Sequence, residues 1–395
     1  MKFLITGGAG FIGCNYVKYL LKNQNKVIVL DNLTYAGNLE NLRGYLREDS
    51  IIIPSIQTKL SKIRILENGK INFDKDITKL NFDKLNSNNY SKTNINKIDK
   101  MILNIFNNRD LIFVYGNIID NRLVNKILPL CDYAVNFAAE THVDRSILNP
   151  DKFIKTDIYG TYSLLESVKK SKNLKKFVHV STDEIYGIAY NKSFTEKDPI
   201  NPRNPYSASK AAADRLVYAY HKTYNLPVNI VRPSNNYGPF QYPEKLIPVM
   251  IIKAYNNEIL PVYGNGKQIR DWLYVEDTVK AIDLVIKKAK IGEIYNIAGR
   301  NEKQNIEIIK YILNYLNKPE DLIKFTKDRP GHDIRYSIDD SKIRTELGFN
   351  QNKKLNESLN YTIKWYINNV KWWRKIIDKD KEYKKFTEQW YASRK

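Results

Sequence analysis

Two adjacent carboxylates, Asp183 and Glu184, follow an apolar run at residues 176–180, with the Thr182 hydroxyl directly before them. The run predicts a buried strand, and in an open α/β sheet the carboxyl end of a strand faces the ligand crevice. Because side chains alternate along an extended chain, we expect the two carboxylates to point in different directions. Carboxylates in different environments can act as a general acid and a general base. A solvated turn is the simpler interpretation, and the flanking motifs decide between the two.

Downstream, Tyr206 and Lys210 are four residues apart in a strongly helical stretch, residues 206–216, so they share one helix face. An ammonium beside a phenol favours the phenolate and lowers its pKa. A phenolate near neutral pH is a base for a sugar hydroxyl while hydride leaves to a nicotinamide. An ordinary surface Tyr is the alternative, which the upstream loop disfavours.

That loop opens the chain, where residues 2–31 follow the pattern strand, glycine-rich turn, helix, strand. In such a unit Gly7 permits the tight turn, Gly10 lets the backbone approach a pyrophosphate and Gly13 lets the helix pack on the strand. The helix N-terminus adds N–H groups and a positive dipole end. Asp31 can accept hydrogen bonds from the adenosine ribose, and its charge repels a 2′-phosphate. The unit therefore predicts NAD rather than NADP.

The composition narrows the class of protein. A chain of 395 residues can bury a sizeable core in two lobes. A net charge of +21 would suit a nucleic-acid binder, but the basic residues are spread along the chain without a nucleic-acid motif, so we expect no such partner. Cys14 and Cys131 are far apart and the four His lack metal-ligand spacing, so we expect neither a disulfide framework nor a metal. Without a long apolar run or a signal peptide, we expect a cytoplasmic protein with no membrane partner.

Together the motifs resemble the extended short-chain dehydrogenase/reductases and, within them, the nucleotide-sugar 4,6-dehydratases, most closely those that act on dTDP-glucose. Their motif Ser-Thr-Asp-Glu-x-Tyr-Gly is present at residues 181–187. Related epimerases and decarboxylases share the glycine loop and the Tyr/Lys pair but typically lack the Asp–Glu pair. The resemblance implies conversion of dTDP-glucose or UDP-glucose to the 4-keto-6-deoxyglucose nucleotide with bound NAD. A nucleotide-sugar 4-epimerase or decarboxylase is the nearest alternative, and a silent NAD-binding regulator is another.

The resemblance also implies three sets of site residues. The catalytic residues are Thr182, Asp183, Glu184, Tyr206 and Lys210. The cofactor-binding residues are Gly7, Gly10, Phe11, Ile12, Gly13, Asp31, Asn32, Leu33, Thr34, Asn117, Ile118, Ala138, Ala139, Thr156, Tyr206, Lys210 and Asn236. The substrate-binding residues are Thr141, His142, Thr182, Asn235, Lys245, Leu246, Pro261, Tyr263, Arg270, Asn305, Arg329 and His332, whose two arginines suit a diphosphate.

Two positions depart from the family pattern. Asn117 and Ile118 stand where the family usually has Asp at the adenine, and an Asn can still accept a hydrogen bond. Asp157 follows Thr156 where the family usually has Asn. A carboxylate there could alter the proton relay near the Tyr/Lys pair.

The fold class follows from alternating strand and helix patterns: a Rossmann-like doubly wound parallel sheet with a smaller, discontinuous α/β substrate-binding lobe. We expect residues 1–187 to form the NAD-binding domain, with a polar surface insert at about 49–111. Residues 188–395 mix the end of that domain (206–235 and 270–298) with the nucleotide-sugar-binding lobe.

The insert contains a polar tract at residues 86–96 and a predicted short helix near 98–106, and we interpret it as a tolerated surface insertion. The aromatic residues Trp365, Trp372 and Trp373 lie on a C-terminal helical pattern, where packing or a subunit contact is expected. The resemblance implies a homodimer formed through two long helices.

Overall fold

The computed structural model describes residues 1–54, 63–65, 71–73, 97–379, 383–384 and 386. Its largest element is an eight-stranded sheet in the order β13-β9-β8-β7-β1-β2-β6-β3, in which every pairing is parallel. The strands are β1 (Lys2–Thr6), β2 (Lys26–Asp31), β3 (Ile51–Ile52), β6 (Leu111–Tyr115), β7 (Tyr133–Asn136), β8 (Lys176–Val180), β9 (Val228–Pro233) and β13 (Ile294–Ile297). The chain reverses its strand order beside β1, so the predicted Rossmann-like doubly wound sheet is confirmed.

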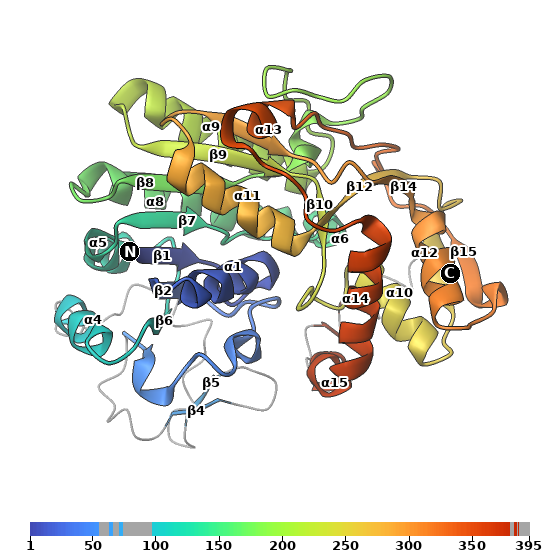
Figure 1. Ribbon diagram of the computed structural model, residues 1–395, viewed down its shortest axis with the longest axis horizontal. Helices are drawn as coiled ribbons and strands as arrows, with labels where there is room; N and C mark the ends of the chain where they lie inside the picture. Colours follow the sequence, from blue (N-terminus) through green and yellow to red (C-terminus); the bar gives the residue numbers. More distant parts are fainter. Residues whose placement is uncertain (55–62, 66–70, 74–96, 380–382, 385, 387–395) are drawn as a thin grey trace.

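Helices cover both faces of this sheet (Figure 1). One face packs against α1 (Phe11–Lys22) and α11 (Val275–Lys288), and the other packs against α4 (Ile98–Phe106), α5 (Asn121–Ile127), α8 (Gly160–Lys170) and α9 (Pro205–Tyr224). Within β1, Phe3 and Ile5 join the first core while Leu4 joins the second. The alternation explains why these strands are apolar at nearly every position: both faces are buried.

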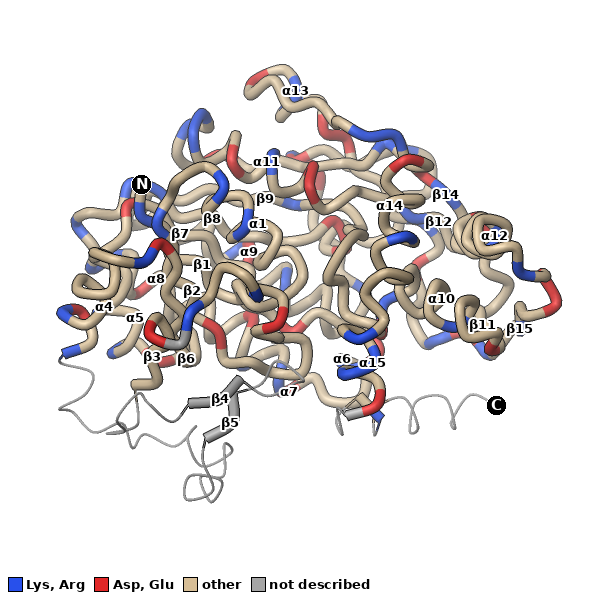
Figure 2. Tube along the Cα trace, turned by 60° about the horizontal axis from the view of Figure 1, so that its bottom comes forward, with Lys and Arg blue, Asp and Glu red and all other residues tan. Residues whose placement is uncertain are grey.

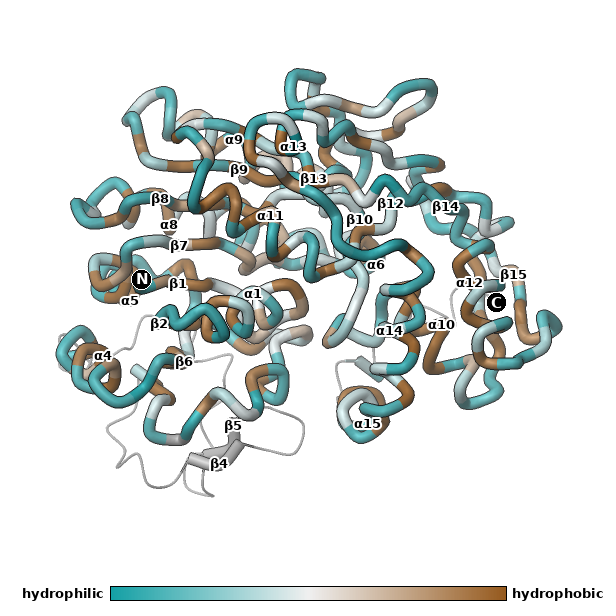
Figure 3. Tube along the Cα trace, viewed as in Figure 1, coloured by the Kyte–Doolittle hydropathy of each residue, from teal (hydrophilic) through white to brown (hydrophobic). Residues whose placement is uncertain are grey.

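A smaller lobe lies beyond the carboxyl ends of the strands (Figure 1). Its sheets are β10 (Asn235–Tyr237), β12 (Ile269–Tyr274) and β14 (Glu302–Gln304) in one, and β11 (Leu260–Tyr263) and β15 (Ile323–Thr326) in the other. Its helices are α10 (Leu246–Tyr255), α12 (Asn305–Tyr315), α14 (Leu355–Asn368) and α15 (Val370–Lys379). Their apolar faces turn inward around a separate core that includes Trp372 and Trp373 (Figure 3).

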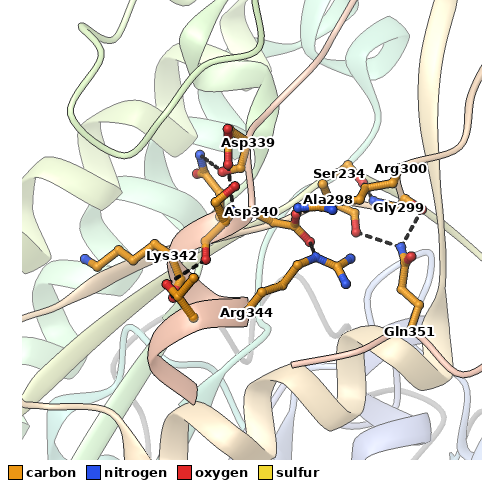
Figure 4. Close-up of polar contacts among 12 residues, drawn as sticks. Ser234, Ala298, Gly299, Arg300, Asp339, Asp340, Lys342, Arg344 and Gln351 are labelled. Atoms are coloured by element: carbon orange, nitrogen blue, oxygen red, sulfur yellow. Dashed lines mark hydrogen bonds and ion pairs between the residues drawn. The ribbon is translucent and has the colours of Figure 1, made fainter. Parts of the chain in front are cut away.

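Residues 334–351 return from the smaller lobe to the large sheet and are tied there by polar contacts (Figure 4). The buried Asp340 accepts a hydrogen bond from Arg300 Nε at 2.7 Å. Gln351 donates its amide to the carbonyl of Gly299, whose own N–H donates to Ser234 Oγ at 3.1 Å. These contacts hold the segment after β13 against the strand end where Ser234 lies.

The ends of the insert are built into the fold: one adds an edge strand to the large sheet and the other packs a helix on its face. β3 pairs with β6 at the sheet edge, and the predicted helix is present as α4 (Ile98–Phe106). The apolar residues at every fourth position of α4 are buried against the second core, as a helical spacing requires. The prediction of a surface insert over all of residues 49–111 is therefore wrong at both ends, and the polar tract at 86–96 lies outside the described residues.

Lys and Arg lie over both lobes and are interspersed with Asp and Glu in the view of Figure 2. No helix in the described part of the chain is long and apolar enough to cross a membrane. Nor do the described residues include a group of three or more His, Cys, Asp or Glu side chains placed to hold a metal ion. Cys14 and Cys131 are buried free thiols.

Candidate active site

Two adjoining cavities lie at the carboxyl ends of the sheet strands. The sheet cavity, about 280 Å³, is lined by the glycine-rich turn after β1 and by residues that follow β2, β7 and β8. The lobe cavity, about 770 Å³, is lined mainly by the smaller lobe. Glu184 and Lys245 line both cavities, so a ligand in one would meet a ligand in the other at these side chains.

Sixteen of the predicted cofactor-binding residues line the sheet cavity. They are Gly7, Gly10, Phe11, Ile12, Gly13, Asp31, Asn32, Thr34, Asn117, Ile118, Ala138, Ala139, Thr156, Tyr206, Lys210 and Asn236. Leu33 does not, because its backbone has a φ of 47° and its side chain packs against the first core. Its contribution is the N–H that it donates to Asp31 Oδ1 at 2.8 Å.

The glycine-rich turn forms a cradle that side chains could not fill. Gly7 has a φ of +67°, in the left-handed region. A Cβ on Gly13 would lie 2.3 Å from the carbonyl oxygen of Gly7, so the close packing of α1 on the turn requires glycine. α1 begins at Phe11 after Gly10, which provides no side-chain cap for the first amides of the helix. Such free amides at a helix N-terminus suit a diphosphate.

Asp31 is held at the end of β2 by two backbone amides. Oδ2 accepts from Ala9 N at 2.9 Å and Oδ1 from Leu33 N at 2.8 Å. Burial raises the pKa of this carboxyl, and the two amides oppose that effect. Each carboxylate oxygen keeps a lone pair for a ribose hydroxyl.

The catalytic residues come from the short turn after β8 and from the first turns of α9, which pack against each other. β8 ends at Val180, and Thr182 caps the 3₁₀ turn η6 (Asp183–Tyr186) by accepting from Glu184 N at 3.3 Å. Asp183 and Glu184 therefore follow each other around a helical turn, so the extended backbone assumed for the prediction is wrong. The two side chains still point in different directions, because Glu184 lines both cavities and Asp183 lines neither. The sequence reasoning did not include this capping Thr, which ends the strand.

α9 begins with a capping box that places the predicted Tyr in its first turn. Asn204 Oδ1 accepts from Ser207 N at 2.9 Å, and Ser207 Oγ accepts from Asn204 N at 3.2 Å. Tyr206 is buried and bonds to Thr182, and Lys210 lies one turn further along. Lys210 Nζ donates to the carbonyl oxygen of Val180 at 2.7 Å.

The expected lowering of the Tyr206 pKa by Lys210 is wrong for this structure. Burial raises the pKa of Tyr206 well above its ordinary value, and the Glu184 and Asp157 carboxylates raise it further. The Lys210 ammonium donates to a backbone carbonyl, and its charge is not among the main influences on the pKa of Tyr206. Burial and the neighbouring carboxylates therefore favour the neutral phenol.

Asp183 and Glu184 occupy different electrostatic surroundings. Burial raises the pKa of Asp183 well above its usual range, and the carboxylates of Glu184 and Asp271 add to the effect. Burial also raises the pKa of Glu184, but its strongest charged neighbours, Arg329 and Arg270, lower it. Asp183 lines neither cavity, and its Oδ2 is buried without a partner. Asp183 therefore favours the protonated form, whereas Glu184 is more readily ionised.

The lobe cavity contains eleven of the twelve predicted substrate-binding residues. They are Thr141, His142, Asn235, Lys245, Leu246, Pro261, Tyr263, Arg270, Asn305, Arg329 and His332, while Thr182 lines the sheet cavity instead. Three of the eleven are cations that converge on one region, and Arg329 Nε is buried without a partner. Desolvation lowers the pKa of His332 to about 3, so this ring is neutral. The cavity is suited to an anion.

Comparison with known proteins agrees with this geometry. A family model described as GDP-mannose 4,6 dehydratase matches residues 4–67 and 77–362. The dTDP-glucose 4,6-dehydratase of Escherichia coli is 39% identical, with 96% of this chain and 97% of that protein covered. The chain belongs to the GDP-mannose 4,6 dehydratase family.

Solved structures extend the comparison. The dTDP-glucose 4,6-dehydratase DesIV of Streptomyces venezuelae, solved with NAD bound, has a TM-score of 0.77 and 36% identity, covering 95% of this chain and 100% of that one. A UDP-glucuronic acid 4-epimerase of Bacillus cereus has a TM-score of 0.71 at 24% identity, covering 93% of this chain and 99% of that one, and shares the fold alone. The 4,6-dehydratases are thus the more similar group.

The site of this dehydratase-family chain includes a tyrosine that the sequence analysis missed. Tyr336 is buried, and its hydroxyl donates to Asp333 Oδ2 at 2.7 Å and lies 3.3 Å from Glu184 Oε2. The Arg270 guanidinium lies 4.3 Å from the centre of its ring. Tyr336 therefore links the substrate-side cations to Glu184, across 152 positions of sequence that no local pattern spans.

The C-terminal residues of the dehydratase-family chain also reach the site. Tyr383 and Phe386 line the lobe cavity together with residues of α15. The Phe386 ring meets His142 edge-on at 5.3 Å, and it lies 4.3 Å from the guanidinium of Arg145. These contacts close one wall of the lobe cavity with two residues to which the sequence analysis assigned no role.

Both departures from the family pattern lie at the sheet cavity or beside it. Asn117 lines the cavity, and its side-chain oxygen accepts from Ile119 N at 3.0 Å. Asp157 is buried behind Thr156, where it bonds to Ser209 of α9. The first departure preserves a turn at the cavity wall, and the second places a carboxylate beside the Tyr/Lys pair.

Proposed function

We propose that this chain is an NAD-dependent 4,6-dehydratase that converts dTDP-glucose to the 4-keto-6-deoxyglucose nucleotide. The observation that carries the proposal is the pair Asp183 and Glu184, two adjacent buried carboxyls of which only the second is surrounded by cations. A reaction that removes water across C5 and C6 needs one acid and one base at neighbouring atoms. Epimerisation or decarboxylation at a 4-keto sugar does not require loss of the C6 hydroxyl.

The sheet cavity fits NAD. The Gly7–Gly13 cradle and the amides at the start of α1 suit its diphosphate, and Asp31 suits the adenosine ribose while repelling the phosphate of NADP. Ser181 Oγ and Asn235 Oδ1 are buried near this cavity without partners, as expected of groups that bond to a ligand. When bound, NAD accepts hydride from C4, returns it to C6, and carries a positive charge in its oxidised form.

The residues of the chain then have distinct tasks. Once the positive charge of bound NAD favours its phenolate, Tyr206, assisted by Thr182 and Lys210, takes the proton of the C4 hydroxyl as C4 is oxidised to a ketone. The ketone acidifies the C5 hydrogen, which Glu184 removes. Asp183 gives its proton to the C6 hydroxyl, which leaves as water, and Glu184 finally returns a proton to C5.

The lobe cavity is proposed to bind the nucleotide diphosphate. Arg270 and Arg329 can pair with phosphate oxygens, and Lys245 lies where the two cavities meet. Arg329 is held by Asp144 at 3.3 Å, leaving its buried Nε for a ligand. His142, Tyr263 and Asn305 complete a polar lining.

A turnover assay with dTDP-glucose and UDP-glucose side by side tests the proposal. We expect the 4-keto product, followed by its alkaline absorbance, from dTDP-glucose without added NADH, and a slower reaction or none from UDP-glucose. An epimerised or decarboxylated sugar would replace the proposal with one of those reactions. The absence of any product from either sugar, with NAD bound, would overturn it.

We further propose that the chain is a homodimer paired through η5 (Ile154–Tyr159), α8 and α9. α8 and α9 pack side by side, with Tyr220 of α9 donating to Glu166 of α8 at 2.8 Å. Large apolar side chains remain exposed on all three elements: Ile154 at 55% and Tyr159 at 50% on η5, Tyr162 at 38% on α8 and Tyr218 at 38% on α9. Such a patch is typical of a protein–protein interface. We expect light scattering to give twice the chain mass, and Ile154→Glu to give a monomer; a monomeric native chain would contradict the proposal.

A further inference from the structure

Asp157 is a buried carboxylate that joins three parts of the active-site wall. It lies on the π turn η5, with 1% of its surface exposed. Oδ1 accepts from Glu140 N at 2.8 Å, in the loop after β7, and Oδ2 accepts from Ser209 Oγ at 2.7 Å, on α9 between Tyr206 and Lys210. One side chain thus fixes the position of both the sheet-cavity wall and the helix that carries the Tyr/Lys pair.

Asp157 also acts on the charges of that pair. Its carboxylate raises the pKa of Tyr206, and its negative charge favours the cationic form of Lys210. In return, Lys210 and the two hydrogen bonds favour ionised Asp157, while burial raises its pKa to about 6. The Asp214 carboxylate likewise favours the cationic form of Lys210. The charges of Lys210 and Asp214 also act on the pKa of His179, which Lys210 lowers and Asp214 raises.

Other charged groups on the elements packed against η5 are engaged elsewhere. Asp151 of α7 (Pro150–Phe153) forms an ion pair with Lys155 of η5 at 2.7 Å, and both side chains are mostly exposed. Lys152 is exposed as well. On α8, Glu166 accepts from Tyr220. Solvent screens the ion pair of Asp151 and Lys155, so this pair has little effect on Asp157, which faces Lys210 and Tyr206 in the protein interior.

We propose that Asp157 is a positioning residue that sets the pH range in which Tyr206 and Lys210 work, by holding a negative charge against them while its two oxygens fix Glu140 and Ser209. The proposal rests on the proposed dehydratase function. An ionised Asp157 disfavours the phenolate form of Tyr206. It therefore moves the acid limb of the pH–rate profile, the range in which the rate rises with pH, to higher pH. Removing the charge should move that limb to lower pH.

Asp157→Asn removes the charge and keeps the contacts. The Asn carbonyl can accept from Glu140 N, and its amide can donate to Ser209 Oγ. Ser209 then gives its single proton to the carbonyl oxygen of Tyr206, which it already reaches at 2.8 Å. We expect the acid limb of kcat/KM to move down by about one pH unit, with the plateau rate changed less than about threefold. The control, Asp151→Asn, removes an exposed charge nearby and should leave the profile in place.

A second measurement needs no substrate. In protein labelled with ¹³C at the lysine side chains, and assigned with Lys210→Met, the titration midpoint of Lys210 should fall in Asp157→Asn and stay in Asp151→Asn. Both shifts together support the proposal. A rate loss with an unmoved profile, or an unmoved Lys210 midpoint, overturns it. If the chain has no dehydratase activity, the lysine titration alone decides.

Discussion

Tyr206→Phe is expected to lower kcat for dehydration by about 10²- to 10⁴-fold, the range associated with loss of a general acid or base. The substitution removes the hydroxyl that bonds to Thr182 and keeps the ring, which packs edge-on against Phe153 at 6.3 Å. Because the first proton transfer is lost, C4 should not be oxidised. Neither 4-keto product nor reduced cofactor should accumulate when dTDP-glucose is added.

Three measurements separate this effect from misfolding. The variant should bind NAD as the native chain does, since the glycine cradle and Asp31 are untouched, and its melting temperature should change little. Tyr190→Phe removes a hydroxyl from a side chain that is 69% exposed and should leave the rate unchanged. Accumulation of reduced cofactor by Tyr206→Phe would show that another group takes the C4 proton.

The fold and the outline of both cavities could be predicted from the sequence because their signals are local. The strand, turn and helix of residues 2–31 each follow from apolar spacing and glycine, and parallel strands bring their carboxyl ends to one edge. The predicted helix at 98–106 was found for the same reason. Once the resemblance assigned the loops, nearly all the predicted residues lined one of the two cavities.

What the sequence missed depends on contacts between distant segments. Tyr336 reaches Glu184 from the returning C-terminal segment, and Phe386 reaches His142 from beyond α15. No spacing rule relates such positions. The sign of the Tyr206 pKa shift failed for a related reason: the neighbouring Lys210 was visible in the sequence, but the burial of the phenol and its closeness to the Glu184 and Asp157 carboxylates were not.

Asp183→Asn is expected to separate oxidation at C4 from elimination. Tyr206, Lys210 and Glu184 remain, so C4 should still be oxidised and C5 should still lose its proton to Glu184. Asn cannot give a proton to the leaving hydroxyl, so we expect dehydration to slow by about 10²-fold or more. Reduced cofactor should therefore build up without product, the reverse of the result expected for Tyr206→Phe.

Isotope exchange and stability make the test of Asp183→Asn specific. In D₂O the variant should take up deuterium at C5 of the bound 4-keto sugar, whereas Glu184→Gln should not.

Folding raises the pKa of Asp183, so the folded chain keeps a proton that the unfolded chain loses above its ordinary pKa. This group therefore lowers the stability of the folded chain as the pH rises from the unfolded to the folded pKa. Asn carries no such penalty, so Asp183→Asn should melt no lower than the native chain at neutral pH. Normal dehydration by this variant would remove Asp183 from the mechanism and move the acid role to a group that lines the lobe cavity.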